Sequence, residues 1–551
     1  MGVKYMTESR VLSPGSYALG LDFSTQAVKI VVLDMHSAEV IYTSNFDYDT
    51  VSARFGTRGG VLPAEQLETR HTSPFMLIEA LDLAFRRLHE GNVDTPCIKV
   101  VKIDAMQHCT VYTDASFGEK LAVLDPGQCL LPQLKLTITR KTSPIWEDRS
   151  PVKEAAYLKS ALEQYGSTQV LTGNRAELRF PAAQILKWAS QSPHEYYQTA
   201  HIFLLSAFLT SILAGKVVPV DTGDGWGTNL NTLDIEHPGW SNVVLKVGDD
   251  YLNSRKTGLS LQSKLGQMVH FDTPLGKISP YFVKKYGINP DALLLAGTGD
   301  NPATLLGCGG HAVISLGSSY TVNGVMQKIT PSLSGEYNVF GYTAGKAMAL
   351  AVFTNGGKVH ESFLKKYIPD GKAANGAKKA WDAYISAAGG PIMRQDEKLM
   401  LPYLLDESLP IRPRGIVRQG FGALDADANI RALHISQVLS LRLHSSHLIY
   451  TDSICVVGGG AKNHFLRQLI ADVFECKTYT IQHANYAAPF GCAVSGARAL
   501  LCISYDEAGT RFVRAERSSL THPLRENQSV IHTLLQRYGV LEHSTNHRVK
   551  P

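Results

Sequence analysis

No apolar run in the sequence approaches the roughly 20 residues that a membrane-spanning helix requires. The N-terminal stretch lacks the apolar core of a signal peptide. The eight cysteines include no CxxC pair and no Cys/His spacing suited to zinc. These absences exclude membrane proteins, disulfide scaffolds and zinc-binding modules. We therefore expect a cytoplasmic protein with reduced thiols and no membrane partner.

Concentrated charge is also absent. Lysines and arginines are scattered, and the net charge is only +5 over 551 residues. A nucleic-acid-binding protein normally carries a basic stripe, so nucleic acid is not an expected partner. There is no G-x-S-x-G motif of the serine hydrolases and no low-complexity linker. What remains is a globular chain, 44% apolar and 19% charged, long enough for two or more domains.

Strand and helix patterns alternate along this chain. Residues 17–34 form two apolar runs joined by a polar turn, which is the pattern of two paired strands. Residues 75–90 carry apolar side chains at helical spacing, and 98–106 is an apolar run typical of a buried strand. The alternation predicts an α/β fold.

The pattern of the first two strands occurs a second time. Residues 312–326 again give an apolar strand, a Gly/Ser turn and a returning strand. A repeat almost 300 residues later is too distant for a solenoid and indicates two related domains. The boundary is expected near 308–312, which divides the chain into a tail, a first domain and a second domain at 1–15, 16–310 and 311–551.

The first turn has the residues to bind a phosphate group. Its hydroxyl and backbone N–H groups suit phosphate oxygens, and Asp22 suits a magnesium ion held through water. The alternative is an ordinary polar hairpin turn. Because residues 316–321 form a similar turn, the two together would clamp a triphosphate. The residues of the first turn are Ser24, Thr25 and Gln26.

A glycine triplet follows the strand pattern within residues 453–474 and precedes a helical one. Glycines at such a place let the backbone approach a ligand, and the helix N-terminus favours phosphate or polar groups. The segment lacks the G-K-[ST] of a P-loop and the G-x-G-x-x-G spacing. A tight turn without a ligand explains it equally well.

Polar side chains also follow the strand at 98–106. Gln107 and His108 come directly after it, and ligands gather at the carboxyl ends of strands in α/β sheets. These two side chains suit the grip of a polyol, although a buried structural histidine is the alternative. Arg175, Arg179, Asp221 and Asp224 lie in polar, Gly-rich segments expected to be loops, where a surface salt bridge is the simplest role for an arginine.

One acid, Asp300, stands alone among the small, apolar and amide residues of 295–307. It precedes Asn301 and Pro302, and proline suits the first turn of a helix. The simplest expectation is therefore that Asp300 caps a helix. A glycine turn before it would also hold the carboxylate rigidly at the end of a strand.

Taken together, these segments resemble the FGGY family of carbohydrate kinases, most nearly the xylulokinases of the longer eukaryotic type. Nine segments match in family order and cover most of the chain: 20–34, 106–112, 143–150, 172–180, 221–230, 297–307, 314–322, 353–363 and 456–474. The resemblance implies two ribonuclease-H-like domains of the actin/hexokinase type flanking a central cleft. It also implies ATP and a sugar as substrates, Mg²⁺ as cofactor, and a monomer or homodimer.

The resemblance assigns roles to individual residues. Asp300 would be the general base, and the sugar would be bound by Gln107, His108, Arg179, Asp300 and Asn301. Asp22 would bind the metal ion. ATP would be held by Ser24, Thr25, Gln26, Gly317, Ser318, Ser319, Trp381, Gly459, Gly460 and Asn463.

Two positions depart from the family pattern. Cys109 replaces a glycine beside the sugar site, in a place where it would narrow the pocket. Tyr320 replaces an aspartate at the second phosphate turn.

The expected reaction is the phosphorylation of D-xylulose by ATP to give D-xylulose 5-phosphate. A free aspartate titrates near 3.9, so Asp300 is expected to accept the proton late in the reaction. Alternatives are a kinase for ribulose, another ketose or a glycerol-type polyol, and a non-catalytic sugar- or nucleotide-binding regulator. A partner-driving ATPase would leave the sugar-side segments without a purpose.

Overall fold

The computed structural model describes residues 14–255, 260–368 and 377–544. Most of the predicted tail, residues 1–13, lies outside them. The chain forms two compact units. The domain bounds 16–310 and 311–551 remain a prediction. Unit 1 comprises residues 1–310, 326–348 and 486–513, and unit 2 comprises residues 311–325, 349–485 and 514–551.

Unit 1 is built on one mixed sheet in the order β11-β12-β5-β1-β2-β3, with β13 beside β5. β1, β2 and β3 are antiparallel neighbours, and β5 runs parallel to β1. β1 is buried along nearly its whole length, which explains its continuous apolar run. The strands are β1 (Tyr17–Phe23), β2 (Ala27–Asp34), β3 (Glu39–Asp47), β5 (Ile98–Ala105), β11 (Pro274–Lys277), β12 (Leu293–Leu295) and β13 (Thr298–Gly299).

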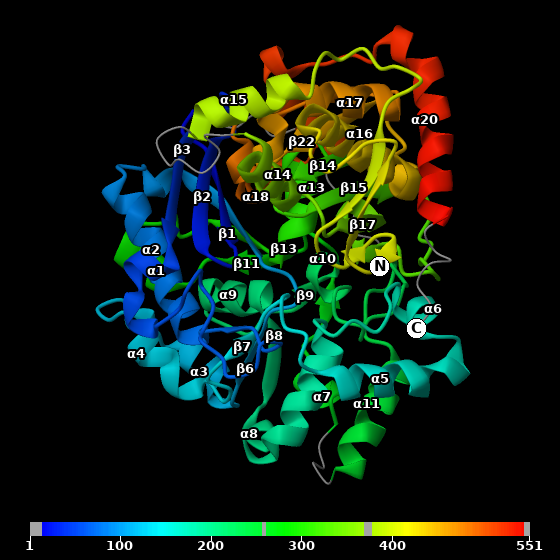
Figure 1. Cartoon of the computed structure of the whole chain (residues 1–551). Helices are drawn as coiled ribbons and strands as arrows, with labels where there is room; N and C mark the ends of the chain where they lie inside the picture. Colours follow the sequence, from blue (N-terminus) through cyan, green and yellow to red (C-terminus); the bar gives the residue numbers. More distant parts are fainter. Residues whose placement is uncertain (1–13, 256–259, 369–376, 545–551) are drawn as a thin grey trace. The chain divides into compact units, whose positions relative to one another are not determined.

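Helices cover both faces of this sheet (Figure 1). α2 (Pro74–Glu90) buries its apolar stripe against one face and begins where Ser73 caps it and Pro74 takes its first position. The predicted helix at 75–90 is therefore confirmed. α18 (Ala487–Leu501) packs against the other face, although it lies almost 400 residues after β5 in the chain.

α18 also fixes the helix that carries Asp300. α13 (Asp300–Gly307) packs along α18 so closely that a Cβ on Gly491 would lie 2.0 Å from the Ala303 carbonyl oxygen. Only glycine permits this approach. The start of α13 is thus anchored to the sheet through a long-range helix contact.

Unit 2 repeats the arrangement of unit 1: the antiparallel hairpin β14–β15 has a parallel strand, β22, beside its first member. Its sheet continues in the order β17-β15-β14-β22-β23. The repeated hairpin confirms the α/β class. The strands are β14 (Ala312–Leu316), β15 (Tyr320–Met326), β17 (Ala347–Phe353), β22 (Ser453–Val457) and β23 (Lys477–Tyr479).

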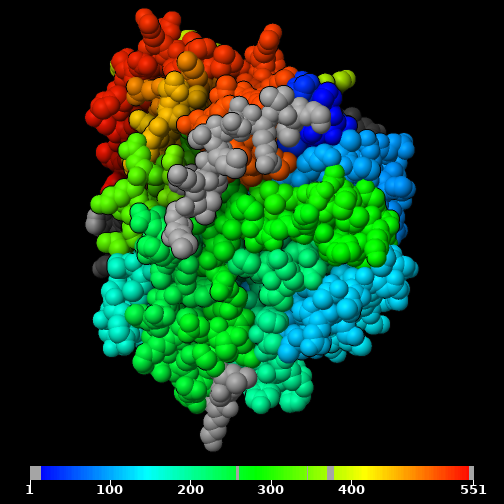
Figure 2. All heavy atoms as spheres, turned by 180° about the vertical axis from the view of Figure 1, so that it is seen from behind, coloured from blue at the N-terminus to red at the C-terminus, as the bar shows by residue number. Residues whose placement is uncertain are grey.

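The helices of unit 2 pack around α16, and side chains of α20, red in Figure 2, form part of its surface. None of the described helices in either unit is long and apolar enough to cross a membrane. The helices of unit 2 include α14 (Gly357–Tyr367), α15 (Ala377–Ala387), α16 (Ala426–Ser445), α17 (His464–Phe474) and α20 (Arg525–Ser544).

Candidate active site

In unit 1 a row of charged side chains crosses three adjacent strands. Asp22 on β1 is in register with Asp104 on β5 and with Lys29 on β2. Lys29 Nζ donates to Asp22 Oδ2 at 3.0 Å, and both carboxylates are buried. Asp22 Oδ1 and Asp104 Oδ1 have no hydrogen-bond partner within the described part of the chain. Buried oxygens without partners mark a place where a ligand completes the contacts.

Asp300 begins α13, with Gly299 as its N-cap, so the expectation that Asp300 itself caps the helix is wrong. Asn301 Nδ2 donates to Asp300 Oδ1 at 3.0 Å, and the backbone N–H groups of Asn301 and Gln107 also bond the carboxylate. Burial and the charge of Asp22 outweigh these bonds and raise the pKa of Asp300 to about 7. The expectation of an ordinary aspartate titrating near 3.9 is therefore wrong.

Asp104 belongs to this row of charged side chains but was not predicted from the sequence. Burial, Asp22 and Asp300 together raise its pKa well above the usual range, and Cys492 Sγ on α18 lies 3.3 Å from its Oδ2. The signal that drew attention to Asp300, a single acid at the end of an apolar strand, is also present in the sequence of 98–106. Lys29, a lysine inside an apolar strand, was a second such signal.

Gln107 and His108 follow β5, and Gln107 contacts Asn301 of α13. Gln107 is buried, donates to the Gly223 carbonyl at 3.0 Å and accepts from Asn301 Nδ2 at 2.8 Å. His108 has the left-handed backbone conformation (φ 71°) and stacks on Phe180 with ring centroids 4.3 Å apart. Such a φ is uncommon outside glycine and occurs at sites where side-chain direction matters.

The hydrogen bonds of His108 fix its tautomer. Nδ1 lies 2.7 Å from the Gly227 carbonyl oxygen, which can only accept, so Nδ1 carries the proton. Burial and the charge of Arg179 lower the pKa of His108 to about 3, so the ring is neutral. Its Nε2 is consequently an acceptor.

Arg179 is the donor on this side of the unit. Its Nη2 donates to Asn338 Oδ1 at 3.4 Å, while its buried Nε has no partner within the described residues. Burial lowers the pKa of Arg179. Arg175, by contrast, forms a local ion pair with Glu177 at 2.6 Å. The prediction of a surface salt bridge thus holds for Arg175 and is wrong for Arg179.

Asp221 and Asp224 were predicted to lie in loops, but both are fully buried. Asp221 ends β9 (Val220–Asp221), and Asp224 lies in α10 (Thr222–Gly225). Ser206 Oγ donates to Asp224 Oδ2 at 2.5 Å, and the Asp224 N–H donates to Asp221 Oδ1 at 2.9 Å. Burial raises the pKa of Asp221 to about 7.

The predicted phosphate turn of unit 1 connects β1 to β2. Ser24 Oγ donates within the turn to the Ala27 carbonyl at 2.8 Å, and Gln26 is exposed. Trp146 Nε1 donates to Thr25 Oγ1 at 3.0 Å, which ties a partly exposed aromatic ring to the turn.

Unit 2 contains a cavity of about 800 Å³, in the size range of small-molecule sites. The structure brings six predicted ATP residues to its wall from three separate segments. Ser319 is not among the lining residues, and its hydroxyl instead donates to the Thr354 carbonyl at 3.4 Å. The six are Gly317, Ser318, Trp381, Gly459, Gly460 and Asn463.

Both the oxygen and the nitrogen of the Asn463 side-chain amide form hydrogen bonds within unit 2. Oδ1 caps α17 by accepting from the N–H groups of Phe465 and Leu466, and Nδ2 donates to His434 Nε2 at 3.0 Å. It shapes the cavity wall while it holds the helix N-terminus in place.

Comparison with known proteins shows which proteins the chain resembles. Residues 387–500 match the model of the FGGY family of carbohydrate kinases, C-terminal domain. The chain is 31% identical to the xylulose kinase of Rattus norvegicus over 483 residues, which cover 85% of this chain and 86% of that protein. It is 30% identical over 510 residues to xylulose kinase 2 of Arabidopsis thaliana, with 89% and 88% covered.

The chain belongs to the FGGY family of carbohydrate kinases. Its fold also matches the solved structure of a ligand-bound xylulose kinase from Lactobacillus acidophilus, with a TM-score of 0.76 over 96% of this chain and 98% of that one at 17% identity. The predicted family and fold class are confirmed.

The two departures from the FGGY pattern lie in different surroundings. Cys109 is fully buried and belongs to the hydrophobic core of unit 1, so its side chain fills the core. Tyr320 is the first residue of β15, is buried, and lines the cavity of unit 2.

Proposed function

We propose that this chain transfers the γ-phosphoryl group of ATP to the primary hydroxyl group of D-xylulose, giving D-xylulose 5-phosphate and ADP, with Asp300 as the general base. The observation that carries this proposal is the raised pKa of Asp300, about 7. A general base works best when its pKa lies near the operating pH, and an ordinary aspartate is too weak. The names of the relatives at 30–31% identity supply the sugar.

The sugar-side groups complement a polyhydroxy substrate. His108 Nε2 accepts a hydrogen bond, whereas the Arg179 guanidinium has an N–H to donate that is unpaired within the described residues. A sugar offers both functions on neighbouring hydroxyl and carbonyl groups. Asn301 is held between Asp300 and Gln107, so its position beside the base is fixed before the sugar binds.

The proton and the phosphoryl group move in a balanced step. Asp300 takes the proton of the sugar hydroxyl as its oxygen forms a bond to the γ-phosphorus of ATP. The bond from that phosphorus to the β,γ-bridging oxygen breaks, and ADP leaves. The protein contributes mainly by holding the hydroxyl in line and by supplying the base.

The oxygen atoms present in unit 1 fit a magnesium ion. Asp22 Oδ1 and Asp104 Oδ1 are buried acceptors without partners within the described residues, and hard cations prefer carboxylate oxygens. No group of three or more His, Cys, Asp or Glu side chains suited to a metal occurs among those residues. Phosphate and water oxygens would therefore complete the coordination around Asp22. Mg²⁺ bound there would neutralise phosphate charge.

ATP consumption measured against a panel of ketoses and polyols tests the proposal. We expect strong activity with D-xylulose. Activity with ribulose or glycerol alone would overturn the choice of sugar, and no ATP consumption with any acceptor would favour the non-catalytic regulator.

A further inference from the structure

A chain of five polar side chains that the proposed reaction does not use begins at the wall of the cavity of unit 2, where His360 is a lining residue. All five are at most 5% exposed, and together they cross from α15 to a hairpin beyond β18 (Leu399–Tyr403). We call them the polar relay: Tyr384, His360, Gln437, Asn355 and Glu407.

The hydrogen bonds of the polar relay all run in one direction. Gln437 Nε2 donates to the Asn355 carbonyl at 2.7 Å, so Gln437 Oε1, 2.6 Å from His360 Nε2, is the acceptor. His360 Nε2 therefore carries the proton. Burial lowers the pKa of His360, so the ring is neutral and its Nδ1 accepts from the Tyr384 hydroxyl at 2.9 Å.

Glu407 is the terminal acceptor of the relay. Its carboxylate accepts from the N–H groups of Thr354 at 2.5 Å and Asn355 at 3.0 Å, and from Asn355 Nδ2 at 3.0 Å. Hydrogen bonds to a charged acceptor are stronger than neutral ones. These hydrogen bonds to Glu407 hold the loop that begins at Thr354 in place.

This loop supports the predicted phosphate turn directly. The N–H groups of Gly357 and Lys358 donate to the carbonyls of Gly317 and Ser318 at 2.9 and 3.2 Å. A Cβ on Gly357 would lie 2.5 Å from the Gly317 oxygen, so glycine is needed at this position for the two segments to approach each other. Movement of the loop would move the turn.

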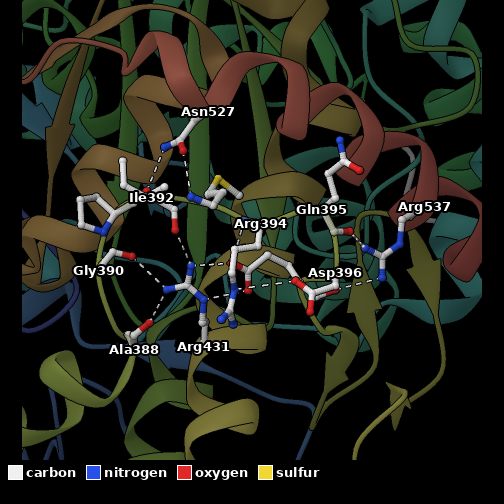
Figure 3. A network of polar contacts seen from close by, with 12 residues as sticks. Ala388, Gly390, Ile392, Arg394, Gln395, Asp396, Arg431, Asn527 and Arg537 are labelled. Atoms are coloured by element: carbon white, nitrogen blue, oxygen red, sulfur yellow. Dashed lines mark hydrogen bonds and ion pairs between the residues drawn. The ribbon is translucent and has the colours of Figure 1, made fainter.

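The other end of the relay is α15, whose Trp381 lines the cavity and packs edge-on against Tyr384 at 5.6 Å. The C-terminal end of α15 has a second, separate anchor (Figure 3). Arg431 donates to the carbonyls of Ala388, Gly390 and Ile392 and to Glu397. Arg431 thus holds the helix to the fold, while the relay joins it to the support of the phosphate turn.

We propose that Gln437 and His360 are positioning residues that hold the phosphate turn and α15 in a fixed position relative to each other. The two ends of a nucleotide then bind to a site that is already formed. The proposal rests on the proposed function in that it takes the cavity of unit 2 as the nucleotide site. Rigid pre-alignment of two subsites raises the affinity of a ligand that spans both, because less conformational freedom is lost on binding. A ligand that contacts only one of the two subsites gains no affinity from this pre-alignment.

Gln437→Met tests the relay in the whole protein, because methionine keeps the volume and removes both hydrogen bonds. The matched control is Ser436→Ala on the same helix. It removes a buried hydrogen bond that the Met400 N–H donates to Ser436 Oγ, and this bond has no part in the relay. Binding of ADP and of adenosine is measured by calorimetry, and KM is measured for ATP and for the sugar. We expect the ADP affinity of Gln437→Met to fall by about tenfold, with adenosine affinity and sugar KM within about twofold of wild type.

Equal ADP affinities of Gln437→Met and Ser436→Ala would overturn the proposal, as would an equal loss for adenosine and ADP. If Gln437→Met does not fold, Tyr384→Phe removes a single hydroxyl and carries the same comparison. In a double variant the two changes should be strongly non-additive, since both break one chain of bonds. Wild-type protein that binds no ADP would instead overturn the proposed function.

Discussion

Unit 1 gathers Asp22, Asp104 and Asp300 around Lys29, whereas unit 2 buries a chain of neutral side chains that ends on one carboxylate, Glu407. In unit 1 burial and the neighbouring carboxylates raise the pKa of Asp104 and of Asp300, and two carboxylate oxygens have no partner within the described residues. In the polar relay each donor meets an acceptor.

The contrast separates two tasks that a kinase must perform. Mutually repelling carboxylates whose oxygens are not all paired cost stability but are poised to take up a proton or a cation. A saturated hydrogen-bond network does neither, and instead fixes geometry. On this view unit 1 supplies chemistry and unit 2 supplies alignment of the nucleotide.

The largest effect is expected from Asp300→Asn, which keeps the shape of the side chain and removes its ability to accept a proton. We expect kcat to fall by about 10³-fold, because general bases typically contribute that much. Steady-state kinetics with D-xylulose and ATP measures it, and calorimetric sugar binding checks that the site is intact. Near-normal turnover by the folded variant would remove Asp300 from the role of base.

A smaller effect is expected from Lys29→Met, which removes the cation paired with Asp22. Lys29 lowers the pKa of Asp300, so its loss should raise that pKa above about 7. The fraction of ionised base at neutral pH then falls, by about tenfold for every pH unit by which the pKa of Asp300 rises.

The pH dependence of kcat/KM for Lys29→Met checks this expectation. Activity should recover toward about pH 9, where the base is ionised again. A loss that is the same at every pH would show that Lys29 acts through structure and not through the charge of the site.

The smallest effect is expected from Glu407→Gln in unit 2. The amide keeps one acceptor oxygen but loses the charge, so we expect about 1–2 kcal/mol less stability and a KM for ATP only a few times higher. Urea unfolding and steady-state kinetics measure the two. A change in the KM for the sugar, with that for ATP unaltered, would contradict the division of tasks between the units.

Local patterns predicted much of the fold. The paired strands at 17–34, the helix at 75–90 and the second hairpin at 312–326 follow from periodicity and turn residues, which depend on neighbours in the chain. The packing of α18 on β1 and β5 depends on segments hundreds of residues apart and left no local signal.

The candidate site divides in the same way. Asp300 stands out in the sequence as a single acid after a glycine turn, and Asp22 as an acid beside a hydroxyl-rich turn. The pKa of Asp300, however, depends on burial and on the charge of Asp22, which only the tertiary structure gives. Asp221 and Asp224 look like loop residues because glycines surround them, yet Ser206 and the surrounding core bury them. The polar relay joins residues from four segments of the chain and has no motif of its own.

Asp300, with its raised pKa, is the proposed base of the phosphoryl transfer. The most direct test is kcat/KM for D-xylulose between about pH 5 and 9 at saturating ATP, in wild type and in Asp300→Asn. Because a protonated carboxyl cannot accept the proton, the wild-type value should fall tenfold per pH unit below about 7 and level off above it. The residual activity of Asp300→Asn should lack this inflection. A flat wild-type profile, or an inflection that persists in Asp300→Asn, would contradict the account.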